Sequence, residues 1–238
     1  MPIRIPDRAV EYILLQRTRH LRIANSALCE RAVDLFPFPI HRYAVKLDAL
    51  IGRQRVKSAY SREIEAEFAQ LRDFLPKECA ALLDIGCGVA GIDVLLYGFY
   101  GTQRPSVHLL DRTRTAEQIR YGFRERASFY NSLEVAKLLL ESNGVPSERV
   151  DLLEATDSNE VRVNRPLDLV ISLLSWGFHY PIETYLDKVY GCLADGGRLI
   201  LDVRRGTGGM DLLRRAFGNS SIIDEGKKHD RALFVKEG

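Results

Sequence analysis

Ala80-Ala81-Leu82-Leu83-Asp84-Ile85-Gly86-Cys87-Gly88-Val89-Ala90-Gly91 is the stretch of sequence that decides the fold. An apolar run of strand length leads into a glycine-rich turn, and the residues that follow, 92–96, have the composition of a helix. Glycine lets a backbone approach a ligand closely, so a strand, a glycine turn and a helix in this order predict a nucleotide-type loop. Gly86, Gly88 and Gly91 also match the pattern G-x-G-x-x-G, which is a weak signal by itself.

Asp84 is the residue that narrows the choice of ligand. It lies two positions before the first glycine, at the mouth of the turn. A carboxylate at this point would repel the diphosphate of NAD or FAD, because like charges at short range oppose each other. It suits a ligand with cationic ammonium and sulfonium groups and no phosphate. S-adenosylmethionine has this charge pattern, and we expect it as the cofactor. The alternative role for Asp84 is that of a helix N-cap.

The composition of the whole chain bounds its class. The 238 residues fit one large α/β domain or one domain with a helical appendage, and 46% of them are apolar. A formal net charge of +2 gives no nucleic-acid signature. The cysteines form no CxxC pair and no ligand spacing is visible, so we expect no metal and a reducing cytoplasm. We see no apolar signal core and no membrane-spanning window.

The pattern of apolar residues divides the chain near residue 75. Residues 1–75 predict helices over 8–30, 41–51 and 61–75, the last with Ser61 as its N-cap. From residue 80 strands alternate with helices, which predicts a parallel sheet with helices on both faces. Expected strands span 80–85, 106–111, 149–154, 167–174, 197–203, 221–225 and 231–236. Expected helices span 90–100, 116–142, 182–193 and 209–217.

The end of the chain predicts a change of strand direction. Only about five residues, 226–230, link the last two strands, which is too short for a crossover, so they must pair antiparallel. The predicted fold is therefore α/β, with a doubly wound, seven-stranded, mostly parallel sheet that ends in an antiparallel C-terminal hairpin. An N-terminal helical extension, residues 1–75, precedes this core of residues 76–238.

Five segments, in order and spacing, resemble motifs of the class I S-adenosylmethionine-dependent methyltransferases over about residues 60–238. They are 83–88, 107–111, 150–157, 167–172 and 196–201. The first segment departs from the family pattern, since the usual third glycine is Ala90 and Gly91 follows it. The third reads Ala155-Thr156 where the family often has Gly-Asp, which leaves open whether Thr156 or Asp157 meets the adenine amino group.

Asp111 ends the second expected strand, where a carboxylate can accept two hydrogen bonds from vicinal ribose hydroxyls. In an open parallel sheet the ligand lies beyond the carboxyl ends of the strands, at the switch between the first and fourth. Tyr60 precedes the third helix and could close over the cofactor. The cofactor-binding candidates are Asp84, Gly86, Cys87, Gly88, Gly91, Asp111, Arg112, Thr156, Asp157, Ser172, Leu173 and Tyr60. We interpret residues 112–132 as a cover over adenosine or a wall of the acceptor site.

The loop after the fourth strand carries the candidates for the acceptor side. It holds the only tryptophan of the chain, Trp176, together with Tyr180, and aromatic faces of this kind can wall a small acceptor. His179 is the candidate general base, because imidazole takes a proton near neutral pH. The alternative is that His179 packs structurally or caps the next helix. His41 could reach the site from the N-terminal helices.

These observations predict an enzyme that methylates a small-molecule or glycan acceptor, at oxygen, with residues 1–75 as a lid. An RNA methyltransferase remains an alternative, since Arg53, Arg55, Lys57 and Arg62 form a local basic run. A non-catalytic scaffold or partner subunit that binds the cofactor is another. The oligomeric state stays open.

Overall fold

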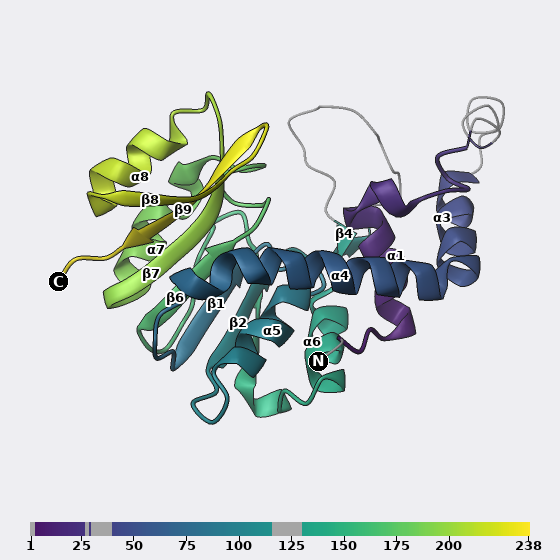
Figure 1. Cartoon of the computed structure of the whole chain (residues 1–238), viewed down its shortest axis with the longest axis horizontal. Helices are drawn as coiled ribbons and strands as arrows, with labels where there is room; N and C mark the ends of the chain where they lie inside the picture. The colour runs from purple at the N-terminus through teal and green to yellow at the C-terminus, as the bar shows by residue number, and fades with distance from the viewer. Residues whose placement is uncertain (1–2, 27–28, 30–39, 116–129) are drawn as a thin grey trace.

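A seven-stranded sheet forms the centre of the computed structural model, which describes residues 3–26, 29, 40–115 and 130–238 (Figure 1). The strand order is β5-β2-β1-β6-β7-β9-β8. β9 runs antiparallel to both β7 and β8, while the other pairs are parallel. The strands are β1 Ala81–Ile85, β2 Ser106–Asp111, β5 Val150–Glu154, β6 Leu167–Ser172, β7 Leu193–Arg204, β8 Ser220–Glu225 and β9 His229–Val235. The predicted fold class, including the closing hairpin, is confirmed.

The strand β1 lies at the switch point of the sheet. It pairs with β2 on one side and with β6 on the other, so Leu82 is beside Val107 and beside Leu169. All five residues of β1 are buried because helices cover both faces of the sheet. Side chains alternate between those faces, and Leu82 and Leu83 therefore belong to two different apolar clusters. The carboxyl end of β1 is thus held at the centre of the protein.

Different helices cover the two faces of the sheet. On the face of Leu82 lie α4 (Arg53–Leu71), α5 (Gly91–Phe99) and α6 (Leu133–Ser142), while α7 (Leu186–Cys192) and α8 (Gly209–Phe217) cover the other. Figure 1 shows α4 crossing in front of the strands and reaching the pair α1 (Asp7–Gln16) and α3 (Ile40–Ile51). One continuous apolar cluster joins these N-terminal helices to the sheet. Short 3₁₀ turns complete the described elements: η1 Thr18–His20, η2 Arg72–Phe74, η3 Ser147–Arg149 and η4 Ile182–Thr184.

Two of the N-terminal helix predictions were wrong in their limits. The third helix begins at Arg53, directly after Gly52, because no glycine or proline interrupts residues 53–71. Ser61 therefore lies within the helix, and its buried hydroxyl makes no hydrogen bond. The first helix ends at Gln16, long before residue 30. The chain after η1 is held instead by the buried carboxylate of Asp48, which accepts the backbone N–H groups of residues 22–24.

The long helix predicted over 116–142 is confirmed only in its last part. A two-residue strand, β4 (Tyr130–Asn131), pairs antiparallel with β3 (Arg114–Thr115), and α6 then starts after Ser132, whose hydroxyl accepts from the Val135 N–H. Residues 116–129 lie outside the described residues. β7 begins at Leu193, four residues earlier than predicted, because Leu193 already pairs with Leu167 of β6 before a shift in register between Leu167 and Leu169. In the described part of the chain, no helix combines the length and apolarity needed to cross a membrane.

Candidate functional site

The loop between β1 and α5 is built by residues with left-handed backbone angles. Gly86 and Gly88 have φ values of +77° and +56°, a region that favours glycine, and the N–H of Gly86 donates to the carbonyl of Leu110 at 2.7 Å. Other segments press on this loop. A Cβ added to Gly86 would lie 1.8 Å from the Ser175 hydroxyl, and one on Gly91 would lie 2.3 Å from that of Tyr60. Only glycine fits both places.

A pair of buried carboxyl groups lies beneath the glycine loop. Asp84 comes from β1 and is 3% exposed, and Asp93 comes from the first turn of α5 and is completely buried. Burial raises the pKa of Asp84 well above its ordinary value, and the nearby carboxyl groups of Asp93 and Asp111 raise it further. Burial likewise raises the pKa of Asp93, to about 7. Asp84 is therefore not simply an exposed N-cap, because it belongs to a buried acidic pair.

Asp111 holds the end of β2 and the glycine loop together. Its Oδ2 accepts the N–H of Gly88 at 2.9 Å and the amide of Asn131 at 2.7 Å, and its Oδ1 accepts the N–H of Arg112 at 2.7 Å. Asn131 in turn accepts a hydrogen bond of 3.4 Å from Gln16 of α1. Burial raises the pKa of Asp111, while these hydrogen bonds lower it. The carboxylate thus connects the first two strands with the N-terminal segment.

The segment after β5 lies beside Asp111 as the spacing predicted. Arg112 donates to the carbonyl of Ala155 and forms a 2.7 Å ion pair with Asp157. The side chain of Asp157 is otherwise exposed, and the Thr156 hydroxyl is hydrogen-bonded to that of Ser158 at 2.8 Å. Both candidates for the adenine contact therefore lie at the same end of the sheet as Asp111, and the choice between them stays a prediction.

Two predicted site residues, Ser172 at the end of β6 and Trp176 in the loop after it, make buried contacts. The hydroxyl of Ser172 donates to the carbonyl of Ile85 and accepts the N–H of Trp176, each at 2.8 Å, so its polar capacity is used inside the protein. Trp176 is completely buried: its indole N–H donates to the carbonyl of Ile182, and its ring packs edge-on against Tyr185. Trp176 therefore supports the loop from within the core, and it is not an exposed acceptor wall.

The loop after β6 contains a strained residue, Leu174, and is held above the glycine turn by the buried ion pair of Asp202 and Arg231. Leu174 has a φ of +55°, which is uncommon for a residue with a side chain, and its N–H donates to the buried carboxylate of Asp202 at 3.0 Å. Asp202 also accepts two hydrogen bonds from Arg231. This arrangement places Ser175 on Gly86. Leu173 is partly buried against the apolar cluster of the N-terminal helices.

Tyr180 and His179, which are adjacent in sequence, have different neighbours. Burial is the main cause that raises the pKa of Tyr180. The negative charge of Asp111 raises this pKa further, while the positive charge of Arg112 lowers it. His179 is exposed as a residue and lies edge-on to Phe178, with ring centroids 4.9 Å apart. Desolvation by its surroundings still lowers the pKa of His179, and the positive charge of Arg204 lowers it further. Tyr180 thus lies on the Asp111 side, whereas His179 lies beside Arg204.

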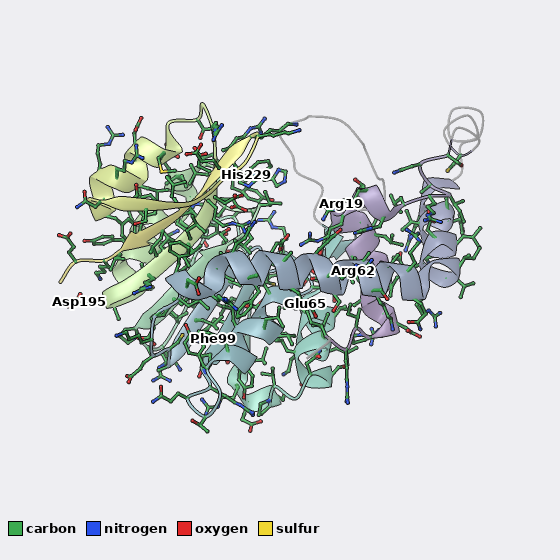
Figure 2. The ribbon with its side chains drawn as sticks, viewed as in Figure 1. Arg19, Arg62, Glu65, Phe99, Asp195 and His229 are labelled. Carbon is green, nitrogen blue, oxygen red and sulfur yellow. The ribbon has the colours of Figure 1, made fainter. Side chains whose placement is uncertain are left out.

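Phe178 connects His179 to the end of β7 and the start of β9. The guanidinium of Arg204 lies 5.8 Å from the centre of the Phe178 ring. The rings of Phe178 and His229 are nearly perpendicular, with their centroids 5.5 Å apart. Figure 2 shows His229 at the end of the sheet opposite to Asp195. A cavity of 240 Å³ opens beside Arg204, between the β7–α8 loop and Asp230. This cluster of Phe178, His179, Arg204 and His229 is named here the aromatic–histidine cluster.

Tyr60 lies within α4 and not before the third helix as predicted, and its hydroxyl reaches the glycine loop. It is buried, its hydroxyl rests against Gly91, and the guanidinium of Arg17 lies 5.3 Å from the centre of its ring. Arg17 is held by ion pairs to Glu63 and Glu67 of α4. His41 lies on α3, but its side chain is outside the described residues. Cys87 is buried beside Asp111, and its thiol pKa is well raised by burial and by the neighbouring carboxyl groups.

Some residues of the site were missed from the sequence. Asp93 carried a signal, because it is the only acid in the otherwise apolar run 91–96. Asn131 and Gln16 carried none, since a polar residue in a helix-like stretch is normally taken as solvated. Phe178 and His229 come together through pairing of strands distant in sequence. Among the described residues, no group of three or more His, Cys, Asp or Glu side chains could hold a metal ion.

Comparisons with known proteins find likeness at the level of three-dimensional structure alone. No family model matches the sequence, and no curated protein matches it. A precorrin-6y C5,15-methyltransferase from Geobacter metallireducens superposes with a TM-score of 0.51 at 14% identity, over 75% of this chain and 89% of that one. The O-methyltransferase TomG from Streptomyces achromogenes, solved with S-adenosylmethionine, gives 0.50 at 14% identity, over 75% and 81%.

An rRNA methylase from Streptococcus thermophilus is a further match, with a TM-score of 0.46 at 14% identity over 73% of this chain and 95% of that one. The two structures of higher score are both methyltransferases, and this chain has a seven-stranded mixed sheet with β1 at the switch and an antiparallel C-terminal hairpin. The chain therefore has the fold of the class I S-adenosylmethionine-dependent methyltransferases.

Proposed function

We propose that this protein binds S-adenosylmethionine at the glycine loop. The observation that carries the proposal is the placement of Asp84 and Asp111 at the carboxyl ends of the neighbouring strands β1 and β2, on either side of a loop where only glycine fits. Asp84 suits an ammonium group, and Asp111 suits two ribose hydroxyls. Thr156 and Asp157 lie next along the same edge and suit an adenine amino group.

The proposed reaction is methyl transfer to an oxygen of the acceptor. Bound S-adenosylmethionine would supply a methyl group on a sulfonium sulfur, a good leaving group. In the proposed transfer, the bond from sulfur to the methyl carbon would break as the bond from oxygen to carbon forms, and the electron pair would stay on sulfur. His179 takes the proton of the acceptor hydroxyl. Its lowered pKa supports this role, because the imidazole is then neutral and able to accept a proton at pH 7.

A small-molecule or glycan acceptor fits the aromatic–histidine cluster better than a nucleic acid does. Much of the basic run on α4 is neutralised within the protein: Arg53 and Lys57 both pair with Asp7, and Arg55 donates to the carbonyl of His20. Cations held in this way are poorly placed to bind phosphates. An aromatic ring with flanking imidazoles suits a sugar or an aromatic alcohol. The N-terminal helices, which rest on the glycine loop through Gln16 and Tyr60, are proposed to act as the lid.

Replacing His179 tests the catalytic part of this proposal. His179→Asn should lower kcat by about 10²–10⁴-fold and leave the affinity for S-adenosylhomocysteine nearly unchanged, because a general base acts only on the chemical step. Turnover would be measured as release of S-adenosylhomocysteine with a panel of phenols and free sugars. Asp187→Asn, at an exposed position of α7 away from this cluster, is the control and should keep the activity.

The pH profile separates a base from a packing residue. The rate of the wild-type protein should fall on the acid side, with its limb below the ordinary imidazole pKa, since the pKa of His179 is lowered. His179→Asn should lose this limb. If His179→Asn keeps the limb and the rate, another group takes the proton. If its cofactor affinity falls together with the rate, His179 is structural. Binding of S-adenosylhomocysteine without turnover on any acceptor would favour the scaffold alternative.

A further inference from the structure

Asp93 is a buried carboxyl group that the proposed reaction leaves unexplained. It is 0% exposed, and no N–H or hydroxyl group of the described residues donates a hydrogen bond to either of its oxygens. A buried carboxylate without partners is costly, and native proteins seldom keep one without a reason. Its position in the first turn of α5 brings partial positive charge from the helix N-terminus, but this compensates only a fraction of that cost.

Three elements pack around Asp93 and present ionisable groups to it. β1 contributes Asp84, whose pKa the neighbouring carboxyl group of Asp93 raises, and α4 contributes Tyr60, whose hydroxyl lies at the start of α5. Cys87 lies on the loop between β1 and α5, and the charge of Asp93 helps to raise the pKa of its thiol. The groups that face this pair or its immediate neighbours are Asp84, Tyr60, Cys87, Asp111, Arg17 and Glu67.

In the part of the chain that the structure describes, the cation beside Tyr60 is already committed. Arg17 reaches the ring of Tyr60, but its guanidinium is held by Glu63 and Glu67. Among the described residues, the groups that surround the pair of Asp84 and Asp93 are carboxyl, thiol and hydroxyl groups. A ligand that brings a cation to this pair would meet two acceptor groups within one site.

The chemistry of the pair dictates what it does without a ligand. An ionised carboxylate can only accept hydrogen bonds, so two carboxyl groups attract each other only when one of them carries a proton. Two ionised groups in a buried site would repel strongly, and one proton is shared instead. The raised pKa of both groups agrees with this: burial is the main cause for each, and the pKa of Asp93 reaches about 7.

We propose that Asp93 is the second half of an ammonium-binding pair with Asp84, and that the α-ammonium group of S-adenosylmethionine displaces the proton that the pair shares. The step balances: the pair loses one proton to the solvent, and the positive charge of the ammonium group takes its place. The inference rests on the proposed cofactor. It makes cofactor binding proton-linked, with tighter binding as the pH rises towards neutrality.

Calorimetry measures the released proton directly. The full-length protein would be titrated with S-adenosylhomocysteine at pH 6.5 in buffers with different enthalpies of ionisation, since a released proton adds the enthalpy of the buffer to the signal. We expect release of up to one proton and a fall in Kd of up to tenfold per pH unit between pH 5.5 and 7. 5′-Methylthioadenosine, which lacks the amino acid group, should bind without release.

Variants assign the proton to the pair. Asp93→Asn keeps the shape of the side chain and gives Asp84 a hydrogen-bond donor, so proton release and the pH slope of Kd should both disappear. Asp187→Asn, at an exposed position of α7, is the matched control and should behave as wild type. If Asp93→Asn does not fold, the comparison of the two ligands on the wild-type protein still decides.

Equal binding enthalpies of S-adenosylhomocysteine in all buffers, together with tight binding, would overturn the inference and leave the proposed cofactor standing. Unchanged release in a folded Asp93→Asn protein would also overturn it, because the proton would then come from another group. No binding of S-adenosylhomocysteine at all would instead be a failure of the proposed function.

Discussion

Gly86→Ala tests the contact that closes the site, between the glycine loop and the loop after β6. The added Cβ would lie 1.8 Å from the Ser175 hydroxyl oxygen and 2.3 Å from the Ser175 Cβ, where no two such atoms can remain. The φ of +77° adds strain of about 1–2 kcal/mol for a residue with a Cβ. Overpacking adds about 1–3 kcal/mol. We therefore expect a loss of about 2–5 kcal/mol in the free energy of unfolding.

A second substitution, Ser175→Gly, separates the cost of backbone strain from the cost of overpacking. In Ser175→Gly the clashing atoms are gone, and the nearest remaining atom is the Cα of residue 175 at 3.8 Å, an ordinary contact. The double variant Gly86→Ala/Ser175→Gly should regain the free energy of unfolding that Gly86→Ala loses to overpacking. Urea unfolding should therefore give a coupling free energy of about 1–3 kcal/mol between the two substitutions. Gly88→Ala is the control, because its Cβ would meet the flexible end of Gln16. Strictly additive effects of Gly86→Ala and Ser175→Gly would refute the contact.

Three further predictions concern the cofactor, the lid and the acceptor. Asp111→Ala should weaken S-adenosylhomocysteine by about 1.5–3 kcal/mol in calorimetry, the range for charge-assisted hydrogen bonds lost without replacement; an unchanged Kd would mean that Asp111 does not hold the ribose. Hydrogen exchange should show added protection over residues 53–63 when the cofactor binds, and no change would make the N-terminal helices a structural or oligomerisation element. Gel-shift assays with tRNA and ribosomal RNA at physiological salt should show no specific submicromolar complex, and such a complex would favour the RNA alternative.

The framework of the sheet could be predicted from the sequence because its signals are local. Buried parallel strands are nearly continuous apolar runs, as in 81–85 and 167–172, and each is bounded by turn residues. The antiparallel pairing of the last two strands could be predicted because the link between them is too short for a crossover. Asp84 and Asp111 could be located because the glycine turn and the strand ends fix their distance along the chain.

The rest depends on contacts between distant segments. Trp176 was expected at an acceptor wall because aromatic residues suit ligand sites, but the carbonyl of Ile182 satisfies its indole and the core encloses it. The network from Gln16 through Asn131 to Asp111 joins three parts of the chain, and no local pattern marks it. Nor does the sequence tell that Asp93 turns inward to Asp84, since an acid in the first turn of a helix is ordinarily a solvated residue.

Binding of S-adenosylhomocysteine by the full-length protein is the measurement that tests the account most directly. Calorimetric titrations with S-adenosylhomocysteine and, in parallel, with NAD separate the two ligand classes that a glycine loop of this kind can serve. The account predicts saturable binding of S-adenosylhomocysteine at one site and no binding of NAD, because Asp84 and Asp93 lie beneath the loop where a diphosphate would have to approach. Tight binding of NAD without any response to S-adenosylhomocysteine would contradict it.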